Sequence, residues 1–294
     1  MQDARDNFRD EMLNSGIIPP KQIIGGGRLY RFHIDGDKHH SKNGWYVFYE
    51  DSNPSGAFGS WKSGINKKWS AKSYNKMNYV EREEFNRKIK AAKKLEEEVR
   101  ELAHQSAATL AKNIYYNCSA VDSSHPYILR KCIKPFHAHQ RGERLVLPII
   151  DLAGNIWSLQ YISPNGDKRF LLNGRIEGHF IPIKYRPQSE ISILICEGFA
   201  TGATLAEAYF DACVIAACNA GNLESVALNI RKKLPSAELI ICADADNVGL
   251  EKARNAAKLI NGTLRIPRFL DSDPKQLTDF NDLYCMQINQ EIRA

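Results

Sequence analysis

Two aspartates separated by one residue follow an apolar run in the last third of the sequence. The run 239–243 has the composition of a buried strand, and Asp244 and Asp246 come directly after it. An unpaired carboxylate is costly to bury, and two neighbouring carboxylates repel each other unless a cation lies between them. One explanation is a metal ion. The other is a helix N-cap, because residues 246–260 have a helical period, but a cap needs only one aspartate.

Other acidic residues have a comparable setting. Glu197 follows the apolar segment ILIC, and Asp279 and Asp282 lie in TDFNDLY, which we expect to be a short loop. Ligands of open parallel α/β sheets bind beyond the carboxyl ends of the strands. Glu197, Asp244 and Asp246 should therefore lie at one edge of one sheet. Five carboxylates gathered there would require cations, and hard oxygen ligands favour Mg²⁺ or Mn²⁺.

The elements that must position these residues alternate between strand and helix from residue 187 onward. This alternation favours a parallel sheet with helices on both faces. Upstream, turn-rich residues 28–64 indicate a small antiparallel sheet, and 78–117 have one apolar helical stripe. We therefore expect an α/β fold in which the parallel-sheet domain follows a mixed α+β domain. The expected divisions are a β-rich N-terminal domain (1–76), a helical linker (77–118), a basic α+β subdomain (119–186) and the parallel-sheet domain (187–294).

Charge is distributed unevenly along the chain. Residues 1–186 have a net charge of +10 and residues 187–294 a net charge of −4, within a total of +6. A basic surface beside an acidic site suits a polyanionic partner such as a nucleic acid. No apolar run is long enough to span a membrane. The charged N-terminus is unlike a signal peptide, so we expect a cytoplasmic protein without a membrane partner.

Seven cysteines are present, and none forms a C-x-x-C pair. We interpret them as reduced, mostly buried thiols rather than as a disulfide framework or a zinc site. They are Cys118, Cys132, Cys196, Cys213, Cys218, Cys242 and Cys285. Histidines of the N-terminal region are interpreted as surface residues, because zinc sites usually combine four closely spaced ligands. They are His33, His39 and His40.

Two motifs together resemble the Toprim domain of primases and topoisomerases. CEGFATG supplies a strand-end Glu-Gly and CADADN a later Asp-x-Asp, about fifty residues apart. The preceding segment resembles that of bacterial-type DNA primases, in which an Arg opens a Leu-Pro strand, a Gly turn follows, and a Lys precedes an aromatic-Leu pair. These positions are Arg144, Pro148, Gly154, Lys168 and Phe170. HPYILRK and CNAGNL are similar to stretches of plasmid- and phage-borne primases, and the resemblance covers residues 120–285.

The N-terminal region differs from that of the primases that the chain resembles. Cellular bacterial primases begin with a zinc ribbon, whereas residues 1–117 contain no cysteine. The layout of residues 44–64 nevertheless resembles that ribbon without its metal ligands. We therefore expect a zinc-free version of this template-contacting sheet, and no structural zinc.

The resemblance implies roles for the acidic and basic residues. Asp244 and Asp246 would ligate a divalent metal, with Asp279 or Asp282 assisting. Glu197 would be a metal ligand or the general base; it could also simply face the N-terminus of the next helix. The residues implied to form a basic lip that binds triphosphate or an RNA–DNA hybrid are Lys168, Arg169 and Arg144, although single basic residues at turns are often only solvated.

Aromatic and amide side chains complete the set of candidates. Most rings of the N-terminal sheet should form its core, although they could stack on bases. These rings are Trp45, Tyr46, Phe48, Phe58 and Trp61. Trp61 and Lys62, near a glycine-bounded turn, are the best candidates for exposed contacts with nucleic acid. Asn219 and Asn222 either line the cleft or cap the next helix.

The resulting hypothesis is a DNA primase, a nucleotidyltransferase that makes short RNA primers on single-stranded DNA for plasmid or phage replication. Its implied partners are single-stranded DNA, ribonucleoside triphosphates and a replicative helicase, and its implied cofactor is Mg²⁺ or Mn²⁺. Two alternatives stay open: a Toprim-type nuclease or topoisomerase-like strand breaker, and a catalytically silent module that binds single-stranded DNA.

Overall fold

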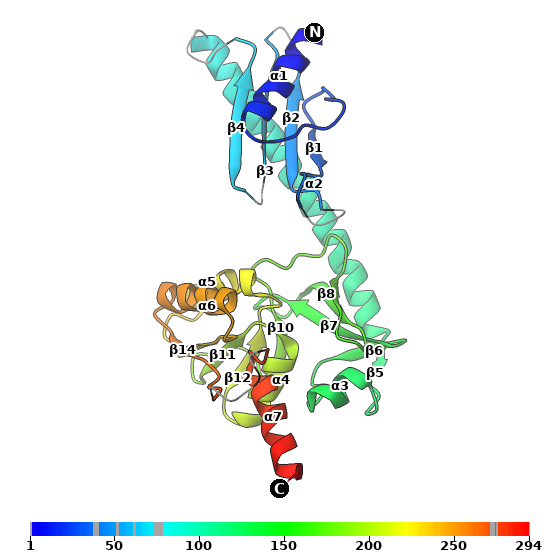
Figure 1. The fold of residues 1–294 in the computed structure, drawn as a ribbon, viewed down its shortest axis with the longest axis vertical. Coiled ribbons are helices and arrows are strands. Elements are labelled where there is room, and N and C mark those ends of the chain that lie inside the picture. The colour runs from blue at the N-terminus through cyan, green and yellow to red at the C-terminus, as the bar shows by residue number, and fades with distance from the viewer. Residues whose placement is uncertain are drawn as a thin grey trace. The chain divides into compact units, whose positions relative to one another are not determined.

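A computed structural model describes residues 2–37, 41–50, 53–60, 63–72, 79–270, 274 and 276–293. The chain divides into two compact units, residues 1–101 and 102–294. Their elements are labelled in Figure 1, and each unit is described by itself.

The first unit is a four-stranded antiparallel sheet with one helix on its face. The sheet has the order β1-β2-β3-β4, and its apolar core contains Phe8 and Met12 of the helix with Tyr46, Phe48 and Phe58 of the strands. The elements are α1 (Gln2–Asn14), β1 (Leu29–Phe32), β2 (Gly44–Tyr49), β3 (Ser55–Ser60) and β4 (Ile65–Ser70). The long helix α2 (Tyr79–Tyr116) begins in this unit and ends in the second. The prediction that most of the candidate aromatic rings of the N-terminal sheet form its core is confirmed by Tyr46, Phe48 and Phe58.

The second unit begins with an antiparallel sheet of the order β5-β6-β7-β8-β9. One face of this sheet packs on the last turns of α2, where Ala111 and Tyr115 contact Val146 and Leu159. The elements are β5 (Ser119–Ala120), α3 (Pro126–Lys131), β6 (His139–Arg141), β7 (Arg144–Ile150), β8 (Ile156–Ile162) and β9 (Lys168–Phe170). The other face contributes Leu145, Leu147 and Ile149 to a core shared with the next sheet.

That next sheet is parallel except at one edge. Its order is β10-β12-β11-β13-β14; β10 pairs antiparallel with β12, and the other neighbours are parallel. Its strands are β10 (Ile181–Lys184), β11 (Ile193–Cys196), β12 (Cys213–Ala216), β13 (Leu239–Cys242) and β14 (Thr263–Arg265). The first strand of the parallel series, β11, lies between the second and the third, so the connections leave it in opposite directions. Ligand sites of doubly wound sheets lie at this switch point.

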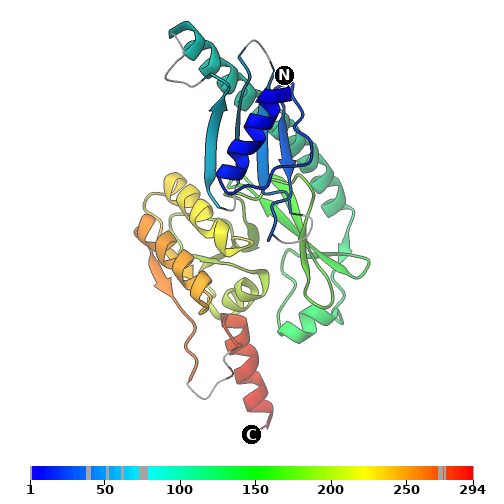
Figure 2. The same ribbon diagram turned by 45° about the horizontal axis from the view of Figure 1, so that its top comes forward.

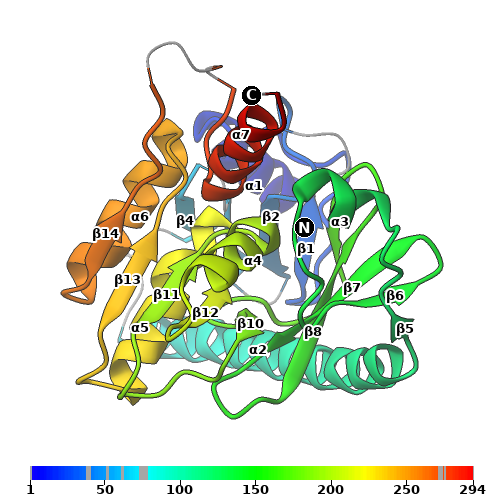
Figure 3. The same ribbon diagram turned by 90° about the horizontal axis from the view of Figure 1, so that it is seen from below.

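Helices cover both faces of this sheet. The helices are α4 (Phe199–Ala208), the 3₁₀ turn η2 (Ala220–Asn222), α5 (Leu223–Lys233), α6 (Asn247–Leu259) and α7 (Phe280–Arg293). Strand residues alternate between two cores: Leu194 packs with α4, and Ile195 with α5 and α6. Figure 2 shows α5 and α6 side by side, and Figure 3 shows α7 beside α4. The expected α/β fold is confirmed.

Strand β10 lies within the range expected for the α+β subdomain and forms the edge of the parallel sheet. One local expectation was wrong. TDFNDLY is not a loop, because helix α7 begins at Phe280. Apolar alternation identifies a strand but not its partner, and a loop was expected where an N-capping Asp279 in fact starts a helix.

All seven cysteines are free thiols. Four of them, Cys196, Cys213, Cys218 and Cys242, are buried in the parallel-sheet domain. Among the described residues, no helix combines the length and the apolar composition that a membrane crossing requires.

Candidate active site

Asp246 is the N-cap of α6. Its Oδ1 accepts hydrogen bonds from the backbone N–H groups of Val248 at 3.0 Å and Gly249 at 2.9 Å. The helix N-cap explanation therefore holds for Asp246. The cap occupies Oδ1, and the side chain is exposed, so Oδ2 remains available to a ligand.

Asp244 has a different environment. It is half-buried at the end of β13, and its Oδ1 is buried without a hydrogen-bond partner among the described residues. Burial raises the pKa of Asp244 to about 7, with further increases from the negative charges of Glu197, Asp279 and Asp246. Oδ1 of Asp244 is therefore a buried acceptor for which the described residues supply no donor.

Glu197 follows β11 and lies near the same aspartates. Burial raises its pKa, Asp246 and Asp279 raise it further, and Lys168 and a hydrogen bond from the Ala220 N–H lower it. The donor belongs to η2, directly before α5, so a second helix start contributes a backbone N–H to the site. The parallel register that aligns Cys196 with Cys242 places Glu197 beside the chain that leads to Asp244.

Asp279 joins the site from the last helix. It precedes α7, and its Oδ1 accepts the Asp282 N–H at 2.8 Å. The Thr278 carbonyl accepts the Ala245 N–H at 2.7 Å, which ties this segment to the loop between the two aspartates. Asp282 itself pairs with Lys131 at 3.2 Å. The structure thus gives Asp279 and Asp282 different surroundings, and Asp279 is the one that affects the pKa values of Glu197 and Asp244.

Lys168 reaches the acidic residues from the neighbouring sheet. It pairs in register with Ile162, whose side chain lies in the core shared with the parallel sheet. A Cβ on Gly198 would lie 3.4 Å from its Nζ. The ammonium lowers the pKa values of both Glu197 and Asp244. Lys168, one of the three residues of the predicted basic lip, therefore lies beside Glu197 and Asp244.

The acidic residues resemble an incomplete cation site. Among the residues that the structure describes, no three carboxylates, histidines or cysteines are close enough together to enclose an ion. The unpartnered Asp244 Oδ1 and the free Asp246 Oδ2 are nevertheless hard oxygen donors at one sheet edge. A cation between them would offset the repulsion that raises the pKa of Asp244. The donor set fits Mg²⁺ or Mn²⁺.

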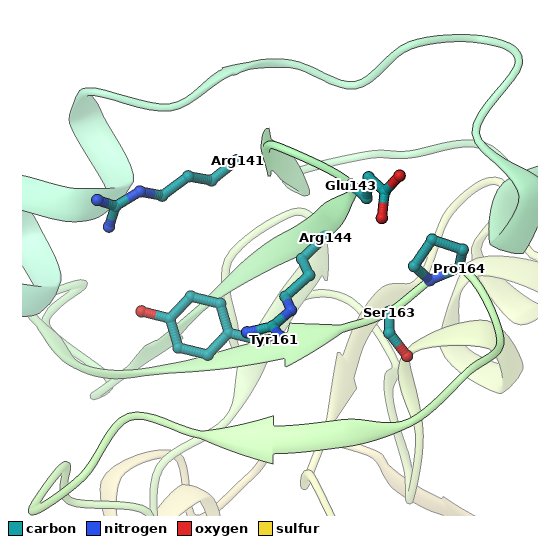
Figure 4. Close-up of a pocket in the computed structure, with 6 residues that line it drawn as sticks. All are labelled: Arg141, Glu143, Arg144, Tyr161, Ser163 and Pro164. Atoms are coloured by element: carbon teal, nitrogen blue, oxygen red, sulfur yellow. The ribbon is translucent and has the colours of Figure 1, made fainter.

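Arg144 and Arg169 lie on the other face of the antiparallel sheet. Arg169 pairs in register with Tyr161, and Arg144 lines a pocket of about 530 Å³ beside Tyr161 and Arg141 (Figure 4). Burial raises the pKa of Tyr161, while the two guanidinium groups of Arg141 and Arg144 lower it. The structure thus places Arg144 and Arg169 on the opposite sheet face from Lys168. It also brings Arg141 and Tyr161 to this pocket, two residues that were not predicted from the sequence.

The two asparagines after β12 differ in role. Asn222 is buried; its Oδ1 accepts the Gly178 N–H, and its Nδ2 donates to the carbonyls of Ile176, His179 and Ala217. It clamps the segment before β10 to the end of β12 rather than lining a cleft, and its side chain makes no capping hydrogen bond. Asn219 starts η2, also without a side-chain cap.

Some candidates lie outside the described residues. Trp61 and Lys62 belong to this group, as do His39 and His40. His33 is exposed, and its Nδ1 lies 3.0 Å from the Ser41 carbonyl.

The chain is similar in sequence to known proteins. The family model described as Toprim domain matches residues 192–289, which contain Glu197, Asp244, Asp246 and Asp279. Two Escherichia coli proteins, both named DNA primase TraC, are 30% and 28% identical to the chain. Each match covers 92% of this chain, but only 27% and 20% of the relatives, so the chain spans about a quarter of their length.

Solved primase structures are also similar. A DnaG primase catalytic domain bound to ssDNA aligns with 65% of this chain and 78% of its own, with 13% identity and a TM-score of 0.45. The primase fragment of the bacteriophage T7 primase-helicase aligns with 60% of this chain and 73% of its own, with 13% identity and a TM-score of 0.42. The matched sequence model and the strand-end acids agree on one part of the chain: residues 192–289 match the Toprim domain, and over 92% of its length the chain is similar to two proteins named DNA primase.

Proposed function

We propose that the chain synthesises short RNA primers on single-stranded DNA in a reaction that depends on Mg²⁺ or Mn²⁺. The observation that carries the proposal is the buried, unpartnered Asp244 Oδ1 among three further acids. The relatives named DNA primase support the reaction class, a nucleotidyl transfer.

The acidic residues would act together in this reaction. Asp244 and Asp246 would hold the divalent cation, with Asp279 assisting, and the bound cation would supply charge neutralisation and in-line placement at the reacting phosphate. Glu197 would act as a further ligand or as the general base for the 3′-hydroxyl. Its raised pKa brings it closer to neutral pH, which suits a general base.

The basic residues would hold the anionic reactants. Lys168 lies beside the acids, where it can bind the triphosphate of an incoming nucleotide. Arg144 and Arg141 line the pocket on the other sheet face, where neither is ion-paired with a described carboxylate, and would bind phosphates of the nucleic-acid strand. Arg169, Trp61, Lys62 and Asn219 complete the proposed contacts. The plasmid or phage setting and a helicase partner are parts of the same proposal.

The test is primer synthesis by the purified chain. Single-stranded DNA templates of varied sequence are incubated with the four ribonucleotides and either Mg²⁺ or Mn²⁺. We expect short RNA products from the wild type, and a loss of at least a hundredfold in Asp244→Ala. Glu251→Ala serves as the control, because Glu251 is an exposed carboxylate on the same helix that Asp246 caps.

The products distinguish the alternatives. Cleaved DNA without RNA synthesis would replace this proposal with a Toprim-type nuclease or topoisomerase-like activity. DNA binding without either product would leave a binding module. Equal synthesis by Asp244→Ala and the wild type would remove the metal site from the mechanism.

A further inference from the structure

A continuous chain of contacts leads from α3 to the acidic residues. Lys131, the last residue of α3, places its Nζ 3.2 Å from Asp282 Oδ1. The other oxygen of Asp282 accepts the Thr278 N–H at 3.1 Å, and the Asp282 N–H donates to Asp279 Oδ1 at 2.8 Å. The Thr278 carbonyl then accepts the Ala245 N–H at 2.7 Å. Three consecutive contacts thus connect Lys131 with the loop that carries Asp244 and Asp246, and a fourth connects Asp282 with Asp279.

A second set of contacts also holds the first turn of α7 against α3. Asn281 is fully buried, and its Nδ2 donates to the Lys131 carbonyl at 2.7 Å and to Thr204 Oγ1 at 2.9 Å. Both α3 and α4 therefore contact the first turn of α7. This second set holds the helix in place when the Lys131 ammonium is removed, so loss of the ion pair should disturb the first turn of α7 without detaching the helix.

We propose that Lys131 is a positioning residue for the acidic site. It acts through Asp282, which fixes Thr278 and Asp279 and thereby the backbone between Asp244 and Asp246. The ion pair is partly enclosed, with side-chain exposures of 27% for Lys131 and 21% for Asp282. Removing the lysine would leave a partly buried carboxylate uncompensated, and that carboxylate would turn away from the Thr278 N–H. This inference rests on the proposed function, because it assigns the ordered acids a cation to bind.

A purely electrostatic role would have the opposite effect on cation affinity. A lysine near the site repels a divalent cation, so a lysine that acted only through its charge would weaken binding, and its removal would strengthen it. A positioning role predicts weaker binding after removal. Outer contacts that orient metal ligands typically contribute about 10–100-fold to affinity. The sign of the change therefore separates the two roles.

The chain offers a matched control at the same end of α3. Lys134 Nζ lies 3.3 Å from Glu207 Oε2, so it also forms an ion pair between this segment and the parallel-sheet domain. Glu207 belongs to α4 and is absent from the contacts that lead to the acids. Lys134→Met removes the same charge and an ion pair of similar length, although Lys134 is more exposed than Lys131, and it does not touch α7.

The experiment measures Mn²⁺ binding to the full chain, without nucleotide or DNA, by the loss of the free-ion electron paramagnetic resonance signal. We expect Lys131→Met to raise the Kd for Mn²⁺ about tenfold or more, Lys131→Arg to restore most of the affinity, and Lys134→Met to bind as the wild type does. Thermal unfolding of each variant checks that the fold is retained. Weaker binding by a folded Lys131→Met with rescue by arginine supports the proposal.

The remaining outcomes overturn it in distinguishable ways. Tighter binding by Lys131→Met would establish an electrostatic role, and unchanged binding would establish none. Equal losses in Lys131→Met and Lys134→Met would mean a general effect of the ion pairs on the domain. These results leave the proposed metal dependence in place, whereas a wild type that binds no Mn²⁺ would remove the proposed function and the positioning role together.

Discussion

Asp244 and Asp246 lie at the end of the same strand but have different physical roles. Asp246 is exposed, and one of its oxygens caps α6. Asp244 is half-buried, and one of its oxygens has no partner among the described residues. The cap fixes the backbone that carries both carboxylates. The aspartate pair therefore combines the two explanations that the sequence left open: a helix N-cap at Asp246 and an oxygen available to a metal ion at Asp244.

Asp244 should make the stability of the metal-free protein depend on pH. Its pKa is about 7 in the folded chain and near 3.8 when unperturbed, so the folded state binds the proton more tightly. The contribution of Asp244 to stability should therefore be greatest below pH 4, fall as the pH rises to about 7, and then level off. Melting temperatures measured in EDTA between pH 4 and 8 should show this decline in the wild type and a flatter profile in Asp244→Asn.

The wild type and Asp244→Asn also show whether Asp244 causes this pH dependence. Mn²⁺ added at pH 7.5 should raise the melting temperature of the wild type, because it binds the folded state, and should have less effect on Asp244→Asn. Parallel pH profiles for the two proteins would show that Asp244 is not the titrating group.

At the scale of elements, starts of helices meet at the ends of strands. Asp246 caps α6, Asp279 caps α7, and Glu197 accepts an N–H group of η2 before α5. Each helix start presents unpaired N–H groups and a partial positive charge, which partly offset the crowding of acids. The same residues that crowd the site thus also fix the helices around it.

Sequence patterns predicted these elements better than their pairing. Alternating apolar segments identified strands β11 to β14 and helices α4 to α6. The signal was clearest for β11, β12 and β13, which are buried along their whole length. These patterns could not show whether Arg144 shares a face with Lys168 or with Arg169, because that depends on register. Lys131 gave no local signal: it pairs with Asp282, 151 residues later in the sequence.

Asn222 holds the segment before β10 against the end of β12, and we expect its loss to reduce stability. Its amide makes four hydrogen bonds to backbone groups on both sides of the β10–β12 pair. Asn222→Ala would leave buried backbone groups unsatisfied and should lower the free energy of unfolding by about 3 kcal/mol. Urea denaturation measures this change, with Asn219→Ala as the control from the same turn. Equal stability of the two variants would contradict the clamp.

Over the whole molecule, the separation of charge suggests that binding and chemistry depend on different residues. Residues 1–186 have a net charge of +10, and the acids lie in the part with a net charge of −4. Nucleic-acid binding is dominated by contacts of Lys and Arg with phosphates, and its affinity falls with salt as counterions are released. Loss of one carboxylate from the acidic site should therefore leave this binding largely intact.

This separation can be measured through the salt dependence of binding to single-stranded DNA. Asp244→Ala should retain the affinity and the slope of log K against log salt concentration that the wild type shows. The double variant Arg141→Met/Arg144→Met should reduce the slope by about 1.4, since each phosphate contact on a single strand contributes ~0.7. Lys112→Met, an exposed cation on α2 outside the pocket, serves as the control. A slope that the double variant leaves unchanged would mean that the pocket in Figure 4 does not contact the strand, and the basic charge that binds DNA would then lie elsewhere in the chain.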